Sequence, residues 1–382
     1  MKQYIENSFF ICATEQSGDN IAEKIINQLN QDKNIYTFDG VGGSKIAPLL
    51  KTQFYSINDF RSIGIFEIIG SINKYLTMIN KLSNVILQNK YNIIITIDSP
   101  DFNYRLAKKI KQKGFKGKII HIVAPTVWAW RKNRAKDFAN VFDKLLVIFP
   151  FEEIYFNKYN LNTKYIGHPI YYIKNYNQNI KKKYIAFLPG SREGEILSLI
   201  QYFKTIVDYI DLISLDFKIF IPTLPHLKKK IIFLSKNWKK KPIIEIDSNK
   251  IDEKFLQTSI AIVCSGTASL EISKRNIPQI VIYKLNIFTE IILKFFIKKK
   301  QYANIINIMS NEMIIPEIVN SKLNKKSILI GFKKLLQDYF DNNKIQIDRS
   351  KKIINKLLLE NSPAKIASIE IKKLFFPKPF KD

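Results

Sequence analysis

The sequence predicts an α/β protein with two doubly wound parallel sheets in series, and three observations support this fold class. Short runs of β-branched and apolar residues alternate with helical stretches, which is the pattern of a parallel sheet covered by helices on both faces. The pattern stops near residues 170–183, where the chain is polar and basic, and then starts again. The chain has 382 residues, 46% of them hydrophobic, which is enough for two cores.

The elements follow in order along the chain. In the first half, strands are predicted at 8–13, 92–97, 118–123 and 144–149. Helices are predicted between them at 19–30, 65–89 and 102–113. In the second half, strands are predicted at 184–189, 217–222, 242–247, 260–265 and 278–283. Ser362 and Pro363 then predict the start of a closing helix over 362–376.

The interruption divides the chain into three segments. We expect residues 1–170 to form an N-terminal Rossmann-like domain and residues 171–360 a C-terminal one. Residues 361–382 contain the closing helix, and the sequence leaves open whether it returns to the N-terminal domain. Ligands of open parallel sheets bind beyond the carboxyl ends of the strands. Functional residues are therefore expected directly after the predicted strands.

Composition limits the function classes. The net charge of +28 fits a protein that binds nucleic acid, anionic lipid or phosphorylated substrates, but it also fits a general richness in lysine. Short basic runs recur on many predicted helices, which favours the compositional explanation. Cys12 and Cys264 each end an apolar run, so we expect buried thiols in a reducing compartment. Neither a signal peptide nor a spanning helix is predicted, which indicates a cytoplasmic protein or one bound to a membrane from its surface.

The segment SGTASLE, residues 265–271, follows a predicted strand and opens a helix. Gly266 permits close approach of a ligand to backbone amides, and the helix N-terminus there favours an anion. Thr267 and Ser269 can add hydroxyl donors, and Ser265, at the start of the segment, is a further candidate for substrate binding. Glu271 lies one turn into the helix, where a carboxylate can accept hydrogen bonds from ribose hydroxyls. The alternative is a capped helix with a buried carboxylate near its start.

Residues 188–195, LPGSREGE, repeat this strand-to-helix arrangement in the same half of the chain. Arg192 supplies a fixed cation suited to a diphosphate. Two such anion sites together predict a pocket for a nucleotide diphosphate sugar.

In the first half, TEQSGD at 14–19 follows the first predicted strand. Glu15, Ser17 and Asp19 are candidates for substrate binding, although Ser17 or Asp19 alternatively caps the next helix. Asp98 ends another predicted strand, where a carboxylate has little structural reason to lie, and we choose it as the general base. Asp101 is the second choice, because it alternatively begins the next helix.

The segment APTVWAWR, residues 124–131, also follows a predicted strand. Trp128 and Arg131 either stack on a sugar and hold a phosphate, or fill the core. His121, His168 and His226 lie in no ligand-like cluster, so no metal site is predicted.

These segments, in this order, closely resemble the lipid-A-disaccharide synthase family, bacterial glycosyltransferases of the GT-B fold. The resemblance covers roughly residues 8–320. It rests on TEQSGD, DGVGGSK, SIGIFEII, TIDSPDFN, PTVWAWR, PFE, GHP, LPGSREGEI, SGTASLE and IPE. SGT followed by Glu is shared by many GT-B enzymes, whereas TEQSGD, IDSPDFN and VWAWR together are specific.

The resemblance implies two Rossmann-like domains that face each other across a cleft, with the acceptor in the first and the UDP-sugar donor in the second. The donor would be UDP-2,3-diacylglucosamine and the acceptor 2,3-diacylglucosamine 1-phosphate, joined by a single inverting displacement without metal or cofactor. Asp98 would deprotonate the acceptor 6-hydroxyl, Arg192 and the SGT loop would hold the diphosphate, and Glu271 the ribose.

Acylated substrates further imply a protein at the inner face of the cytoplasmic membrane, in peripheral contact with anionic lipid. The apolar stretch 63–80 is then either a lipid-facing helix or an ordinary buried one. The rival enzyme is another UDP-sugar protein of the GT-B fold, such as a sugar 2-epimerase or a cell-wall transferase. The epimerase would need more carboxylates and histidine around the cleft. A nucleic-acid-binding protein is the rival from another class, and no recognised module or aromatic-basic stripe supports it, so no nucleic-acid partner is expected. The oligomeric state is left open.

Overall fold

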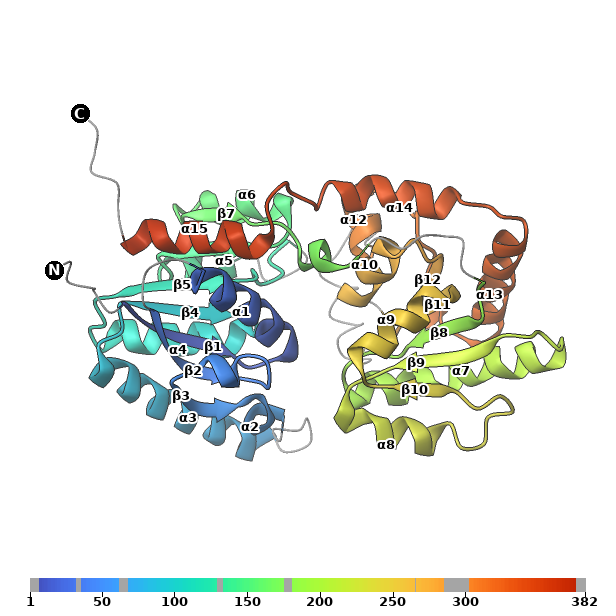
Figure 1. Ribbon diagram of the computed structural model, residues 1–382, viewed down its shortest axis with the longest axis horizontal. Helices are drawn as coiled ribbons and strands as arrows, with labels where there is room; N and C mark the ends of the chain where they lie inside the picture. The colour runs from blue at the N-terminus through green and yellow to red at the C-terminus, as the bar shows by residue number, and fades with distance from the viewer. Residues whose placement is uncertain are drawn as a thin grey trace. The chain divides into compact units, whose positions relative to one another are not determined.

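The computed structural model describes residues 7–31, 36–61, 68–128, 133–174, 181–264, 266–284 and 302–375. The chain forms two compact units. Unit 1 comprises Met1–Tyr171 together with Leu359–Asp382, and unit 2 comprises Tyr172–Leu358 (Figure 1). The C-terminal segment therefore belongs to the same unit as the N-terminus. Among the described residues, no helix combines the length and apolar character needed to cross a bilayer.

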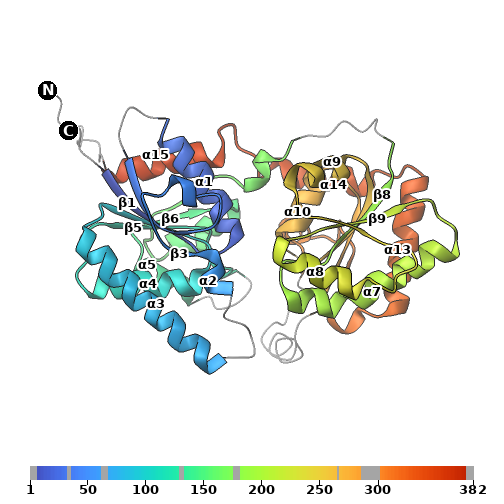
Figure 2. The same cartoon turned by 60° about the horizontal axis from the view of Figure 1, so that its bottom comes forward.

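Unit 1 contains a seven-stranded parallel sheet in the order β3-β2-β1-β4-β5-β6-β7. Its strands are β1 (Asn7–Ala13), β2 (Tyr36–Gly42), β3 (Thr52–Ser56), β4 (Ile93–Ile97), β5 (Lys118–Ile122), β6 (Lys144–Val147) and β7 (Thr163–Tyr165). Its helices are α1 (Gln16–Leu29), α2 (Ile57–Arg61), α3 (Ile68–Asn89), α4 (Pro100–Gln112), α5 (Arg134–Ala139), α6 (Glu153–Asn157) and α15 (Pro363–Phe375). Helices α3, α4, α5 and α6 cover one face of the sheet, and α1 and α15 cover the other (Figure 2).

Unit 2 repeats this plan with a six-stranded parallel sheet in the order β10-β9-β8-β11-β12-β13. Its strands are β8 (Tyr184–Leu188), β9 (Lys218–Pro222), β10 (Ile243–Glu245), β11 (Thr258–Cys264), β12 (Gln279–Tyr283) and β13 (Glu317–Val319). Its helices are α7 (Glu193–Leu212), α8 (Pro225–Leu234), α9 (Ser248–Leu256), α10 (Thr267–Lys274), α12 (Ile305–Ser310), α13 (Lys325–Phe340) and α14 (Ile345–Asn355). Helices on both faces of both sheets confirm the predicted doubly wound α/β class.

The cores explain why these segments form strands and helices. The central strands are buried on both faces, so they consist of nearly continuous apolar runs such as IIITI in β4. The helices carry most of their apolar residues on one side, and that side packs against the sheet. Cys12, the last residue but one of β1, and Cys264, the last residue of β11, are both buried, as predicted.

The stretch proposed as a lipid-facing helix falls largely on α3. Within its described part, Met78 and Ile79 are buried in the core while Asn73, Lys74 and Asn80 are exposed. This part of α3 is therefore an ordinary amphipathic helix packed on the sheet. On its outer side Leu76 is 44% exposed, so the lipid-facing interpretation stays a prediction; residues 63–67 and the side chains of residues 68–72 lie outside the described part of the chain.

Helix α15 is joined to the sheet of unit 1 by a buried ion pair. The ammonium group of Lys144, on β6, donates to the carboxylate of Glu370, on α15, and Lys373 donates to the same carboxylate at 2.5 Å. Burial alone would raise the pKa of Glu370, but the hydrogen bonds from Lys144 and Lys373 lower it below its ordinary value. The pair fixes the last helix on the unit that also contains α1.

Candidate active site

The strand order of unit 1 reverses between β1 and β4, and open parallel sheets bind ligands beyond the carboxyl ends of the strands at such a point. The loop after β1 carries Glu15, the first turn of α1 carries Ser17, and the turn after β4 carries Asp98 and Ser99. The predicted base and two of the predicted binding residues are therefore brought together from positions more than 80 residues apart in the sequence.

A hydrogen-bond network holds Asp98. The hydroxyl of Ser17 donates to Asp98 Oδ2 at 2.5 Å, and the backbone N–H of Ser99 donates to Asp98 Oδ1 at 2.9 Å. The hydroxyl of Ser99 in turn donates to Glu15 Oε1 at 3.0 Å. Asp98 and Ser99 both have positive φ angles, +57° and +41°, a strained conformation that non-glycine residues adopt mainly where the surroundings enforce it. The half-buried carboxylate is thus fixed at the edge of the sheet.

Two residues behind the carboxylate maintain this turn. Asn103, fully buried on the first turn of α4, donates from Nδ2 to the carbonyl oxygen of Asp98 at 2.7 Å. A Cβ atom added to Gly18 would lie 3.1 Å from the carbonyl oxygen of Ile97 and 3.6 Å from Asp98 Cβ, so a glycine lets α1 begin against the end of β4. Ser99 and Asn103 were not predicted as site residues from the sequence, although both lie in the TIDSPDFN motif.

Asp19 does not join this network. It is fully buried, and its carboxylate accepts hydrogen bonds from the backbone N–H groups of Gly43, Lys45 and Ile46 at 2.8, 3.0 and 3.4 Å. These contacts shape the loop after β2 and leave Asp19 no exposed atom for a ligand. Its predicted role in substrate binding is therefore replaced by a structural one.

In unit 2 the strand order reverses between β8 and β11, and the loops after these strands carry the two predicted anion-binding motifs. Gly190 has a φ of +105°, and a Cβ atom there would lie 2.2 Å from Glu195 Oε2. That same oxygen accepts hydrogen bonds from the backbone N–H groups of Ser191 and Arg192 at 3.0 and 3.2 Å. The turn therefore requires glycine, and it places the Arg192 side chain, 69% exposed, 3.6 Å from Glu195.

The loop after β11 opens α10. Gly266, with a φ of +127°, and Thr267 are both exposed, and the first amides of a helix have no partner within the helix. The Glu271 side chain is 49% exposed and lies 3.9 Å from the guanidinium of Arg275. The carboxylate is therefore accessible at the surface, although partial burial beside its neighbours raises its pKa above the ordinary value. Ser265 lies outside the described residues.

Each unit thus has one group of candidate residues at its switch point. In unit 1 it is the hydrogen-bonded carboxylate of Asp98, and in unit 2 it is the exposed Arg192 together with the N-terminus of α10. Residues 9–370 match the family described as lipid-A-disaccharide synthetase. This chain belongs to that family.

Curated relatives agree with the family match. The lipid-A-disaccharide synthase of Rickettsia typhi is 34% identical over 388 residues, covering 96% of this chain and 99% of the relative. That of Gluconobacter oxydans is 29% identical over 340 residues, covering 86% and 81%. The similarity extends through both units, so it covers the Asp98 network as well as the Arg192 and Gly266 loops.

Solved structures show the same GT-B fold at low sequence identity. The MnaA structure from S. aureus with UDP has a TM-score of 0.64 at 14% identity and covers 97% of this chain and 96% of that one. The UDP-GlcNAc 2-epimerase from Neisseria meningitidis bound to UDP-GlcNAc has a TM-score of 0.61 at 11% identity, covering 98% and 100%. These neighbours include the class of the rival enzyme, so the fold alone does not separate the two, and the family match does.

Behind the Gly266 loop, a buried polar network that the sequence analysis missed fixes α10. Gln279 Nε2 donates to the carbonyl oxygen of Ser269 at 2.9 Å and to the hydroxyl of Ser273 at 2.8 Å, and Asn304 Nδ2 donates to the Ser269 hydroxyl. Glu317, in the IPE motif, accepts the backbone N–H of Asn304 at 2.9 Å. The IPE motif, which the family shares, was the sequence feature that could have indicated this network.

Trp128 in unit 1 is half-buried and packs edge-on against Phe151, with ring centroids 5.6 Å apart. Its indole N–H is buried beside the carboxyl of Glu152 but lacks the geometry of a hydrogen bond. Glu152 accepts the backbone N–H of Phe149 at 3.1 Å, and burial raises its pKa to about 8, so the carboxyl is protonated at neutral pH. Trp128 therefore packs against Phe151, and its indole N–H lies near the neutral carboxyl group of Glu152. Arg131 lies outside the described residues.

Replacing Glu152 with glutamine, which has the shape of the protonated acid, is expected to stabilise the protein increasingly as pH rises. Between the ordinary pKa of 4.5 and about 8, the unfolded glutamate loses its proton while the folded one keeps it. Wild-type stability therefore falls relative to Glu152→Gln by at most about 1.4 kcal/mol per pH unit. Urea unfolding at pH 5 and pH 8 measures the difference. Glu253→Gln, at an exposed position, is the control, and equal pH dependence in both variants contradicts the assignment.

Proposed function

We propose that this chain transfers 2,3-diacylglucosamine from UDP-2,3-diacylglucosamine to the 6-hydroxyl of 2,3-diacylglucosamine 1-phosphate. The products are the β-1,6-linked lipid A disaccharide 1-phosphate and UDP. The observation that supports this proposal most is the placement of Asp98 at the switch point of unit 1, in a chain that belongs to the lipid-A-disaccharide synthetase family. Unit 1 then binds the acceptor and unit 2 the donor.

Asp98 acts as the general base. Its oxygens accept hydrogen bonds from the hydroxyl of Ser17 and from the backbone N–H of Ser99, and these two bonds fix the direction of the carboxylate. The carboxylate takes the proton of the acceptor hydroxyl as the oxygen attacks the anomeric carbon of the donor. The bond from that carbon to the UDP oxygen breaks in the same displacement, so the anomeric configuration inverts.

The donor half supplies positive charge where UDP develops negative charge. The exposed guanidinium of Arg192 and the first amides of α10, at Gly266 and Thr267, hold the diphosphate and stabilise the leaving group. Glu271, half-exposed one turn further along, accepts hydrogen bonds from the ribose hydroxyls. The loops after β8 and β11 meet at one switch point, which supports their action on a single ligand.

The acylated substrates place the enzyme at the inner face of the cytoplasmic membrane, in peripheral contact with anionic lipid. The net charge of +28 supports this location, since basic residues near an anionic surface attract the protein to it.

Arg192→Ala is expected to weaken UDP binding about 10- to 100-fold, because a charge-assisted hydrogen bond contributes roughly 1.5–3 kcal/mol. Isothermal titration calorimetry with UDP measures the loss. Lys239→Ala is the matched control, because Lys239 is an exposed cation of the same unit that pairs with Asp211 at 3.3 Å. Equal UDP affinity in Arg192→Ala and wild type would remove Arg192 from the donor site.

Glu271→Ala is expected to weaken UDP binding about 10-fold, the effect of losing one or two hydrogen bonds to a carboxylate. The same variant should bind inorganic pyrophosphate as tightly as wild type does, because pyrophosphate has no ribose for Glu271 to contact. Glu253→Ala serves as the control carboxylate. Undiminished UDP affinity in Glu271→Ala contradicts the ribose role.

A further inference from the structure

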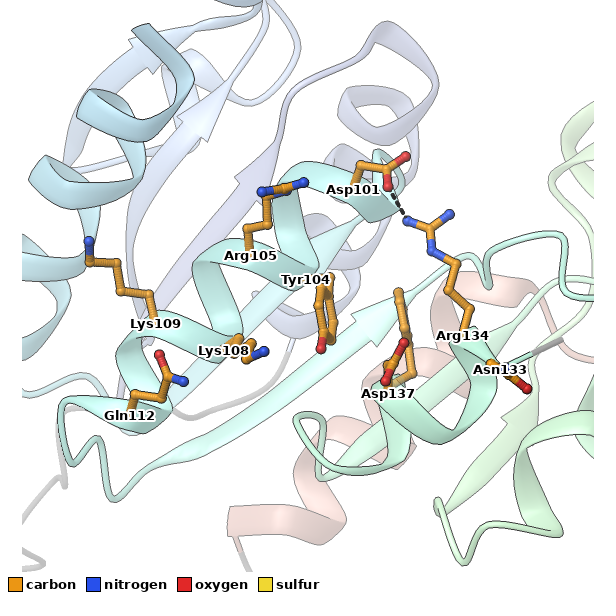
Figure 3. A pocket seen from close by; sticks show the side chains of 10 residues that line it. Asp101, Tyr104, Arg105, Lys108, Lys109, Gln112, Asn133, Arg134 and Asp137 are labelled. Atoms are coloured by element: carbon orange, nitrogen blue, oxygen red, sulfur yellow. Dashed lines mark hydrogen bonds and ion pairs between the residues drawn. The ribbon is translucent and has the colours of Figure 1, made fainter. Parts of the chain in front are cut away.

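A groove of about 910 Å³ runs between α4 and α5 on unit 1, within the size range of small-molecule sites. It begins at Asp101, on the first turn of α4 and three residues after Asp98, and follows α4 toward its carboxyl end. Figure 3 shows Arg134 turned toward Asp101 at one end, with Lys109 and Gln112 at the other. The groove therefore begins within one helical turn of the proposed base, although Asp98 itself is not among the residues that line it.

The sequence of α4 places three cations along this groove. Arg105, Lys108 and Lys109 are spaced i, i+3 and i+4, so they share one face of the helix. Like charges at this spacing destabilise a helix unless a partner compensates them. Lys109 donates to Asn80 Oδ1, and Lys108 lies 5.9 Å from the centre of the Tyr104 ring. Across the described part of the chain, neither Arg105 nor Lys108 forms an ion pair with a carboxylate.

The other groups of the groove suit a sugar. Tyr104 stacks on Phe138 with ring centroids 5.6 Å apart and an interplanar angle of 12°, which presents a flat aromatic wall. Asp101 and Asp137 are exposed carboxylates that can accept hydrogen bonds from hydroxyl groups. Arg134 donates to Asp101 at 2.5 Å and holds that carboxylate in place. Cations alone would indicate a general polyanion surface, whereas cations with carboxylates and an aromatic ring indicate a phosphorylated sugar.

We infer that this groove holds the phosphorylated sugar of the acceptor, with Arg105 and Lys108 binding its phosphate. This inference rests on the proposed function. Helix α4 rises about 1.5 Å per residue, so Arg105 lies roughly 7 Å and Lys108 roughly 12 Å beyond the start of the helix. That span matches one hexose phosphate whose free hydroxyl lies at the Asp98 turn and whose phosphate lies between the two cations.

The double variant Arg105→Ala/Lys108→Ala is expected to raise the KM for 2,3-diacylglucosamine 1-phosphate about 10- to 100-fold, while the KM for the UDP-sugar and the thermal unfolding midpoint stay unchanged. Lys108→Arg should retain a KM near the wild-type value. Lys113→Ala/Lys116→Ala removes the same charge from the same unit outside the groove and is the matched control. An unchanged acceptor KM in the double variant, with wild type active, overturns the inference and leaves the function intact.

Two further measurements separate the remaining outcomes. Calorimetric titration with glucosamine 1-phosphate needs no turnover, so weaker binding by the double variant supports the groove even if wild type forms no disaccharide. Equal binding of that probe by both proteins overturns the inference. If the double variant instead loses only its sedimentation with phosphatidylglycerol vesicles, the groove is a lipid-docking surface and the inference is wrong.

Discussion

Replacing Asp98 with asparagine is expected to lower the rate of disaccharide formation about 100- to 10,000-fold, the range that a general base contributes. Asparagine tolerates the positive φ of this position and keeps the hydrogen bond from the backbone of Ser99, so the turn should persist. Only the capacity to take a proton is lost. Single-turnover transfer of radiolabelled sugar measures the chemical step directly.

The controls for this variant separate chemistry from folding. UDP affinity and the thermal midpoint should match wild type, because Asp98 belongs to unit 1 and the donor loops to unit 2. Glu23→Gln, a carboxylate on α1 that lies 3.5 Å from Lys24, should retain the wild-type rate. A rate for Asp98→Asn within threefold of wild type would show that another group removes the proton.

Glu370→Ala is expected to destabilise the protein by about 3–5 kcal/mol, because it leaves the ammonium group of Lys144 buried without its partner. Lys144 is only 3% exposed, and water cannot replace the carboxylate. Urea unfolding at pH 7 measures the loss, together with release of α15 detected by limited proteolysis. The pKa of Glu370 is lowered in the folded state, so the contribution of the pair is present above the ordinary pKa of a glutamate and disappears on acidification.

Two comparison variants sharpen this prediction. Lys144→Met/Glu370→Leu removes both charges and should recover much of the lost stability, because no buried charge remains unpaired. Lys204→Ala breaks the exposed pair with Asp208 and should cost less than about 1 kcal/mol. A loss in Glu370→Ala no larger than that in Lys204→Ala would contradict the buried-pair assignment.

The sequence predicted the central strands of both sheets and the edge strand β10, but it missed β2, β3, β7 and β13. Burial explains much of the difference. Strands β4, β5 and β6 are almost entirely buried, so their sequences IIITI, KIIHI and KLLV are mostly apolar. Strands β2 and β3 lie at one edge and have the sequences YTFDGVG and TQFYS, in which polar residues and glycine interrupt the pattern. Their pairing depends on β1, which a local pattern cannot reveal.

In the candidate site, too, residues with a local sequence pattern were predicted and residues that depend on distant partners were not. Asp98, Arg192 and Gly266 were predicted because each directly follows a recognisable strand, and parallel strands bring such residues to one edge. Asp19 was misassigned because its partners at residues 43–46 are more than 20 positions away and leave no local trace. Gln279 was missed for the same reason, since only the fold places it against Ser269.

The most direct test of the proposed function is a transfer assay with purified wild-type protein, radiolabelled UDP-2,3-diacylglucosamine and 2,3-diacylglucosamine 1-phosphate. The account predicts a labelled disaccharide 1-phosphate and one UDP released for each disaccharide formed. Neither product should appear when the acceptor is omitted. An epimerised UDP-sugar, or unchanged substrates with a folded and UDP-binding protein, would contradict the account.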